Sequence, residues 1–199
     1  MIPWVLVLGL AAAEPPAQKE AKPLVDIAQA IPRAVLELHY ATPNNFLHRA
    51  VYAHARCLLR SDVAEELARV EARLEKGGYR LKLWDCYRPL SVQWDMWKLV
   101  PVRGLVADPN QGGSHHNRGT AVDASLVDLE GRAVDMPSEH DDFTKRGKRD
   151  ALCAHPAVAQ RRTLLQSAMK AEGFTTIRTE WWHFDAPGAD FAPLLDEPL

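Results

Sequence analysis

The sequence predicts a single α+β domain, in which helices flank a mostly antiparallel sheet. Helical and strand patterns alternate along the chain without the regular strand–helix–strand rhythm of a parallel sheet. The 199 residues, 47% of them hydrophobic, are enough for one compact core. The formal net charge of −2 gives no indication of a nucleic-acid partner or of an anionic membrane surface as partner.

Residues 1–13 are predicted to be a secretory signal peptide. Their apolar run ends in Ala11, Ala12 and Ala13, which fits an A-x-A cleavage pattern, and it is too short to cross a bilayer. No Lys or Arg precedes the run, so an apolar N-terminal strand is the alternative. Residues 14–23 are then a Pro-containing spacer before the domain at 24–199. We expect export to the periplasm without stable membrane insertion, or a cytoplasmic protein if the segment is not a signal.

Helices are predicted at residues 61–77, 91–100 and 161–172. The first is the clearest, because four apolar residues at helical spacing form one stripe: Val63, Leu67, Val70 and Leu74. Asp62 and Glu65 fit a capping box at its start.

Strands are predicted at 79–86, 120–127, 174–177 and 181–184. In the strand that follows Thr120, alternate residues share a face, so Asp123 is expected on the side opposite the apolar core. Its neighbours on that face, Ala121 and Ser125, are small and leave space above the carboxylate. This face of the sheet is therefore a candidate site.

A metal site is predicted above Asp123. Gly119 lets the preceding loop turn back, so that His116 overhangs the carboxylate, and His183 supplies a third ligand from the last strand. Two nitrogens and one oxygen leave one tetrahedral position for water, as in catalytic zinc sites. Glu180 is expected at the lip of the strand, where it reaches that water as a general base. Each residue also has an ordinary interpretation, as a structural hydrogen-bonding group or a solvated strand end.

Two motifs together resemble the zinc D-Ala-D-Ala peptidases. SHHNRGTAVD, residues 114–123, matches S-x-H-x-x-G-x-A-x-D, and EWWHF, residues 180–184, matches E-x-W-H with an aromatic residue after it. The segments YATPNNF, VYAHARCLLR and DCYRP resemble the D-alanyl-D-alanine dipeptidase branch, the VanX-type enzymes. The resemblance extends from about residue 25 to residue 184.

The resemblance implies one zinc ion per chain and a role for each matching residue. It implies that the metal ligands are His116, Asp123 and His183, that the catalytic residues are Glu180 as base and Arg88 as transition-state cation, and that the substrate-binding residues are Asp141, Ser114 and Tyr40. The acid that meets the substrate amine is Asp141 or its neighbour Asp142, because the segment DMPSEHDDF lacks the Gly and Phe usual in the family. Arg88 has the alternative of a structural pair with Asp85. His115 fills a variable position and is left out of the metal set.

The implied reaction is hydrolysis of D-alanyl-D-alanine to two D-alanines by metal-activated water. One alternative is a D,D- or L,D-carboxypeptidase that acts on peptidoglycan stem peptides, and another is a non-catalytic zinc-binding wall module. The pair Trp181–Trp182 favours the dipeptidase branch. The presence of Glu180, the expected catalytic base, argues against a non-catalytic zinc-binding module. Cell-wall turnover, use of D-alanine as a nutrient and antibiotic resistance remain open as biological roles.

The chain has three cysteines, Cys57, Cys86 and Cys153. Export would permit one disulfide, for which Cys57–Cys86 is the preferred pairing. The alternative is three buried thiols that pack as small hydrophobic groups. The sequence contains no C-x-x-C motif, so a cysteine-based zinc site is not expected.

Overall fold

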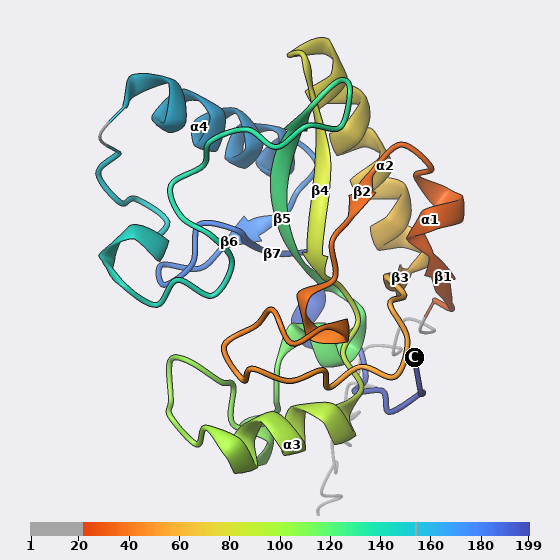
Figure 1. Cartoon of the computed structure of the whole chain (residues 1–199). Helices are drawn as coiled ribbons and strands as arrows, with labels where there is room; N and C mark the ends of the chain where they lie inside the picture. Colours follow the sequence, from red (N-terminus) through yellow and green to blue (C-terminus); the bar gives the residue numbers. More distant parts are fainter. Residues whose placement is uncertain (1–21, 154) are drawn as a thin grey trace, which may run out of the picture.

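The computed structural model describes residues 22–153 and 155–199, which form an α+β fold with a five-stranded sheet (Figure 1). The predicted signal peptide and residues 14–21 of the predicted spacer lie outside the described residues. The strands of this sheet, in spatial order, are β2 (Val35–Leu36), β4 (Tyr79–Asp85), β5 (Ala121–Asp128), β7 (His183–Asp185) and β6 (Thr175–Thr176). A separate antiparallel pair joins β1 (Leu24–Asp26) to β3 (Leu58–Arg60). The predicted fold class is confirmed.

The pairing of strands β4, β5 and β7 places the polar residues of the site side by side. Strand β4 pairs with β5 antiparallel, and an irregularity between Leu83 and Asp85 brings Asp85 opposite Asp123. On its other edge β5 pairs with β7 in a register that sets Asp123 opposite His183. Only the β2–β4 pair of this sheet is parallel.

The helices of the described chain are α1 (Ile27–Ala30), α2 (Ser61–Lys76), α3 (Leu90–Leu99) and α4 (Pro156–Ala171). The 3-10 helices are η1 (His39–Ala41), η2 (Pro109–Gln111), η3 (His115–Arg118), η4 (Lys145–Gly147) and η5 (Ala189–Phe191). In the view of Figure 1, α2 and α4 lie beside the upper part of the sheet and α3 lies below it. Helix α2 packs against both β4 and α4, and its predicted apolar stripe is buried in the main core.

Two local predictions about helix starts need correction. The capping box of α2 does not form: Asp62 lies within the first turn, where its carboxylate accepts a hydrogen bond from the adjacent Val63 N–H at 3.0 Å. The first residue of α2 is instead held by a backbone hydrogen bond, in which the N–H of Ser61 donates to the carbonyl of Pro23 at 2.9 Å. Helix α4 begins earlier than predicted, since Pro156 occupies its first turn, where a missing N–H costs nothing.

The predictions for two of the strands also need adjustment. Residues 121–127 of β5 are buried on both faces, so the face that carries Asp123 is covered by other elements instead of being open to solvent. Strand β7 begins at His183, so Trp181 and Trp182 precede the strand, although both side chains are buried in the core. The site therefore lies inside the molecule, between the sheet and the loops over it.

The predicted disulfide between Cys57 and Cys86 is present and closes a loop with a sequence separation of 29. It ties the start of β3 to the segment that follows β4, and Cys153 is free and half-buried. None of the helices within residues 22–153 and 155–199 has the length and apolar character needed to cross a membrane.

Candidate active site

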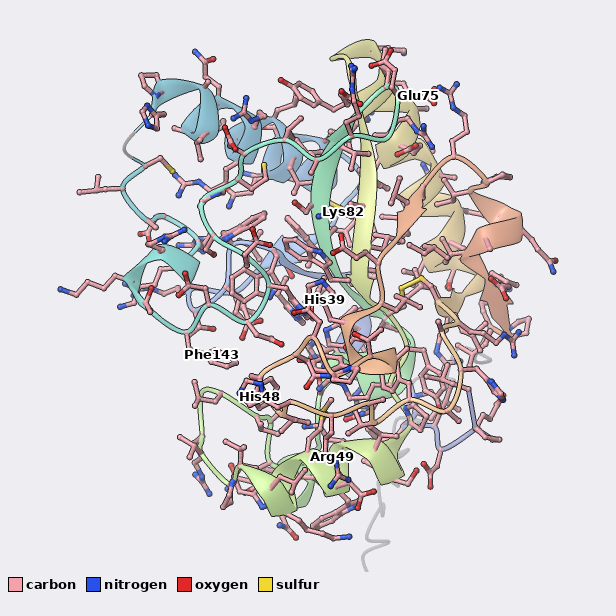
Figure 2. The ribbon with its side chains drawn as sticks, in the orientation of Figure 1. His39, His48, Arg49, Glu75, Lys82 and Phe143 are labelled. Carbon is pink, nitrogen blue, oxygen red and sulfur yellow. A yellow bond between two sulfur atoms is a disulfide. The ribbon has the colours of Figure 1, made fainter. Side chains whose placement is uncertain are left out.

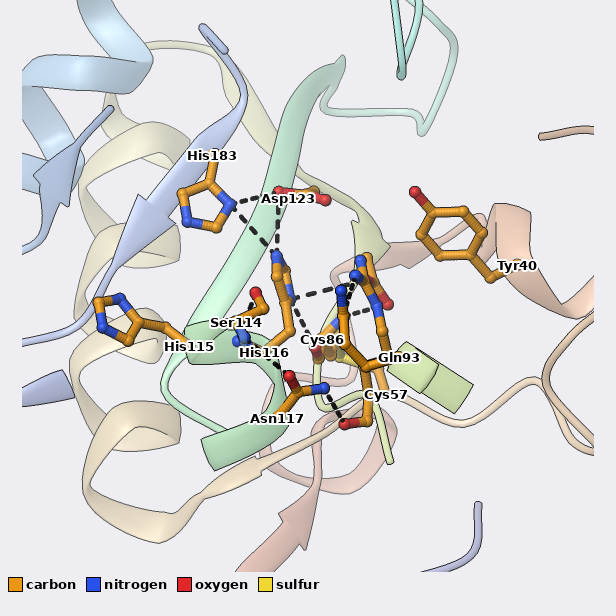
Figure 3. Close-up of polar contacts among 12 residues, drawn as sticks. Tyr40, Cys57, Cys86, Gln93, Ser114, His115, His116, Asn117, Asp123 and His183 are labelled. Carbon is orange, nitrogen blue, oxygen red and sulfur yellow. Dashed lines mark hydrogen bonds and ion pairs between the residues drawn. A yellow bond between two sulfur atoms is a disulfide. The ribbon is translucent and has the colours of Figure 1, made fainter. Parts of the chain in front are cut away.

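Three side chains from different elements converge on one point at the ends of β5 and β7 (Figure 3). His116 comes from η3, Asp123 from β5 and His183 from β7, and one ligand atom of each lies within 4.8 Å of the other two. Nε2 of His116 lies 3.2 Å from Nδ1 of His183, which lies 3.0 Å from Oδ1 of Asp123. All three side chains are buried.

The loop before β5 holds His116 in place through local capping. Ser114 accepts a hydrogen bond from the backbone N–H of His116 at 3.2 Å, and the Asn117 side chain accepts one from the backbone of Ser114. Gly119 ends the turn at φ 67°, a left-handed conformation that glycine adopts without strain. The expected return of this loop over Asp123 therefore has a clear backbone cause.

The ring nitrogens that face away from the cluster are each engaged by another group. Nδ1 of His116 lies 2.7 Å from the carbonyl of Cys86, which can only accept, so this nitrogen carries the proton and Nε2 presents its lone pair to the cluster. Nε2 of His183 lies 3.0 Å from Oδ1 of Asp185. Such outer partners orient imidazole ligands in metal sites. The donor set of two nitrogens and one carboxylate oxygen thus fits a zinc-type metal ion.

The electrostatics of the cluster favour an ionised carboxylate. Burial opposes the charged form of Asp123, but the surrounding histidines, above all His116, hold its pKa well below its usual range. Burial would also lower the pKa of His183, yet hydrogen bonds to Asp123 and Asp185 raise it well above its usual value. A metal ion and protons therefore compete for His183.

Glu180 lies just before β7, outside the regular strand, as expected for a residue at its lip. Its Oε2 is 3.9 Å from Nδ1 of His183. Burial raises the pKa of Glu180, although His183 opposes that shift. A carboxylate with a raised pKa is a stronger base than an ordinary glutamate, which suits a proton-accepting group next to the cluster.

Arg88 follows β4 and is buried beside the same cluster. Its Nη2 donates to Asp85 at 2.6 Å and its Nη1 donates to Gln93 at 2.7 Å. Burial disfavours the cation, but the Asp85 carboxylate outweighs this effect and holds the pKa of Arg88 well above its usual value. The structural pair with Asp85 therefore exists. It fixes a guanidinium whose central carbon lies 5.0 Å from the ring centre of Tyr40, at the cavity.

Asp141 and Asp142 occupy different environments. Asp141 has a φ of 58° and a largely buried carboxylate, which accepts hydrogen bonds from the Tyr40 hydroxyl at 3.0 and 3.2 Å. Asp142 instead accepts from the backbone N–H of Thr144 at 2.9 Å, which stabilises a turn. Of the two acids, Asp141 alone is among the residues that line the cavity.

One cavity of about 260 Å³ brings together all the residues for which the sequence predicted a role. These are Tyr40, Arg88, Ser114, His116, Asp123, Asp141, Glu180 and His183. Its apolar lining includes Phe46, Met96, Leu105, Val106 and Ile177. His115 also reaches the cavity, but its two ring nitrogens lie 2.8 Å from Asp185 and 2.9 Å from Asp190, and it is not part of the ligand cluster.

Several buried polar residues next to this cavity were not predicted from the sequence. Asp185 contacts both His183 and His115, Gln93 holds Arg88, and His140 contacts the carboxylate of Asp123. His140 stands beside Asp141 in the sequence, but nothing in the local pattern indicates that it is buried. Only Asp185 had a usable signal, because it lies two positions after His183 and so shares its face of a strand.

A two-histidine, one-carboxylate cluster beside a half-buried acid and a buried arginine is the arrangement of a metal-dependent hydrolase. The family model described as D-Ala-D-Ala dipeptidase, peptidase M15, matches residues 20–197. The D-alanyl-D-alanine dipeptidase of Escherichia coli strain K12 is 38% identical over 172 residues, which cover 86% of this chain and 89% of that protein. The chain belongs to the peptidase M15 family of D-Ala-D-Ala dipeptidases, which are metallopeptidases.

Other known proteins show lower similarity to the chain. The D-alanyl-D-alanine dipeptidase of Enterococcus faecalis strain V583 is 32% identical over 179 residues, with 80% of this chain and 85% of that protein covered. A crystal structure of the vancomycin-resistance D,D-dipeptidase VanXYg with a D-Ala-D-Ala phosphinate analogue matches with a TM-score of 0.43 and 22% identity. That match covers 67% of this chain and 53% of the other. The family assignment rests on the sequence relatives.

Proposed function

We propose that the protein is a zinc-dependent dipeptidase that hydrolyses D-alanyl-D-alanine to two D-alanines. The observation that carries the proposal is the single cavity in which the His116, Asp123 and His183 cluster, Glu180, Arg88 and Asp141 all meet. A zinc ion held by the cluster would polarise the scissile carbonyl and lower the pKa of a water ligand to ~7.

The side chains of the chain itself supply the remaining chemistry in this proposal. Glu180 takes a proton from the attacking water and delivers it to the departing amine nitrogen. Arg88, held by Asp85 and Gln93, presents a fixed cation to the oxygen that gains negative charge. Asp141 pairs with the free ammonium group of the dipeptide, while Tyr40 and Ser114 shape the cavity around the substrate.

Zinc content and product analysis of matched variants test this proposal. The purified protein should bind about one zinc ion per chain and release D-alanine from D-Ala-D-Ala, and a chelator should abolish the activity. His116→Ala, Asp123→Ala and His183→Ala should each lose zinc and activity together, whereas His115→Ala should keep its zinc. Full zinc content in the His183→Ala protein would overturn the ligand assignment.

We also propose that the protein is exported, with residues 1–13 removed as a signal peptide. The Cys57–Cys86 disulfide supports this proposal, since disulfides persist in oxidising compartments and are rare in the cytosol. N-terminal sequencing of the protein from cell fractions should find a chain that begins near residue 14 in the periplasmic fraction. A cytosolic chain that begins at Met1 would overturn it.

A further inference from the structure

A row of hydrogen-bonding side chains leads from the metal-ligand cluster toward the protein surface. Nε2 of His140 lies 3.0 Å from Oδ2 of Asp123, and Nδ1 of His140 lies 3.3 Å from Nδ1 of His39. Nε2 of His39 lies 3.2 Å from Oε1 of Glu37, whose other oxygen lies 2.9 Å from Nζ of Lys82. His39 and Lys82 are labelled beside the sheet in Figure 2.

The two oxygens of Asp123 face different partners. Oδ1 points at the cluster, 3.0 Å from His183 and 3.4 Å from His116. Oδ2 points away from the cluster and meets His140. A carboxylate whose second oxygen is held in this way presents one oxygen, not two, to a bound metal ion.

The direction of these hydrogen bonds follows from the chemistry of the end groups. The carboxylates of Asp123 and Glu37 accept only, so Nε2 of His140 and Nε2 of His39 both carry protons. The contact to Asp123 is therefore always a donated N–H, and His39 fixes the opposite side of the His140 ring.

Packing prevents the His140 ring from turning away. Its side chain is 0% exposed. The ring stacks on Trp84 at a centroid distance of 5.2 Å and an interplanar angle of 25°, and its neighbour Trp182 meets it edge-on at 5.8 Å. The donor is thus immobilised by aromatic neighbours as well as by His39.

We propose that His140, backed by His39, is a positioning residue that orients Asp123 so that only Oδ1 faces the metal ion. The inference rests on the proposed metal ligands, and it adds a residue that acts through one of them. Removing such an outer hydrogen bond in metal sites weakens metal affinity by about 10- to 100-fold. His140 also lies 3.6 Å from Oδ2 of Asp141, so its loss is expected to raise the KM for the dipeptide as a separate effect.

The positioning role of His140 is tested by substitutions that keep the shape of its side chain but remove the hydrogen-bond donor to Asp123, or the reverse. His140→Phe keeps the aromatic stacking on Trp84 without a donor. His140→Gln and His140→Met have similar length, but only Gln can donate. The zinc Kd, measured on the full-length protein by competition with a chelator, should rise about 10- to 100-fold in the Phe and Met variants and should be largely restored in the Gln variant.

Two controls separate positioning from general damage to the fold. Val70→Ala, in the core stripe of α2, should lower the melting temperature without changing the zinc Kd. In an Asp123→Ala background, His140→Phe should cause no further loss of residual zinc affinity, because residues that act through one another are not additive.

The outcomes distinguish this inference from the proposed function. If the wild type binds zinc and His116→Ala does not, but the His140→Phe Kd stays within about twofold of wild type, the positioning role is overturned and the ligand set stands. If the Phe variant fails to fold, equal Kd values for the Gln and Met variants overturn the role in the same way. A wild-type protein that binds no zinc overturns both proposals.

Discussion

Replacing Asp141 with asparagine tests whether the protein recognises the free amine of its substrate. The substitution keeps the shape of the side chain and an oxygen that can accept the hydrogen bond from Tyr40, but it removes the negative charge. Burial raises the pKa of Asp141, although His140 opposes the shift. The buried carboxylate is therefore short of compensating charge in the free protein, and a substrate ammonium group would supply it.

The expected magnitude follows from the burial of the carboxylate, whose side chain is 11% exposed. Exposed ion pairs contribute less than about 1 kcal/mol, whereas breaking a buried charge pair costs about 2–5 kcal/mol. At 1.36 kcal/mol for each tenfold change, the buried range corresponds to a loss of about 30-fold to several-thousand-fold in kcat/KM. We expect Asp141→Asn to fall within this range on D-Ala-D-Ala.

The assay compares three substrates on wild type, Asp141→Asn and the control Asp142→Asn. Wild type should cleave D-Ala-D-Ala well, N-acetyl-D-Ala-D-Ala poorly and a wall pentapeptide hardly at all, because an acylated nitrogen leaves Asp141 unpaired. Asp141→Asn should lose most activity on the free dipeptide but little of the residual activity on the acetylated one. Asp142→Asn should change kcat/KM by less than about fivefold, since its carboxylate stabilises a turn outside the cavity.

Two results would contradict this role of Asp141 or the dipeptidase activity itself. If Asp141→Asn kept more than about a third of wild-type kcat/KM on the dipeptide, the carboxylate would not pair with the substrate amine. If the wild-type protein cleaved the dipeptide and the pentapeptide at comparable rates, it would be a carboxypeptidase, whatever the effect of Asp141→Asn on kcat/KM.

Three further predictions address the base, the disulfide and a close backbone contact. Glu180→Gln should keep its zinc and its melting temperature but lose about 100- to 10,000-fold in kcat; a variant with more than about a tenth of wild-type kcat would exclude Glu180 as the base. Reduction of Cys57–Cys86 should lower the free energy of unfolding by roughly 3–4 kcal/mol in urea titrations, from the chain entropy of the loop with separation 29, and an unchanged midpoint would contradict this. Gly147→Ala should lower the free energy of unfolding by at least about 1–3 kcal/mol, because the added Cβ would lie 1.8 Å from the backbone oxygen of Asp142. An unchanged melting temperature would show that the loop around Gly147 can move to accommodate the Cβ.

The fold was largely predictable where one element has one strong pattern. The apolar stripe of α2 has helical spacing and is buried as expected, and β4 lies within the predicted range 79–86. The start of α2 was not predictable from its capping residues, because Ser61 bonds to the backbone of Pro23, far away in the sequence. The burial of both faces of β5 depends on which loops cover it, and local periodicity contains no such information.

The residue types of the site can be recognised in the sequence, because two motifs with characteristic spacing contain His116, Asp123, Glu180 and His183. Most of the residues that support the site became apparent only in the tertiary structure. Asp185 and Gln93 lie close in the sequence to His183 and Arg88, with which they form hydrogen bonds. His140 and His39, in contrast, are 101 positions apart. They become partners only when η1 and the loop that contains His140 pack together over β4 and β5. Short-range spacing can encode ligands that lie on one strand or one turn, whereas a hydrogen bond between distant segments exists only after the core has brought those segments together.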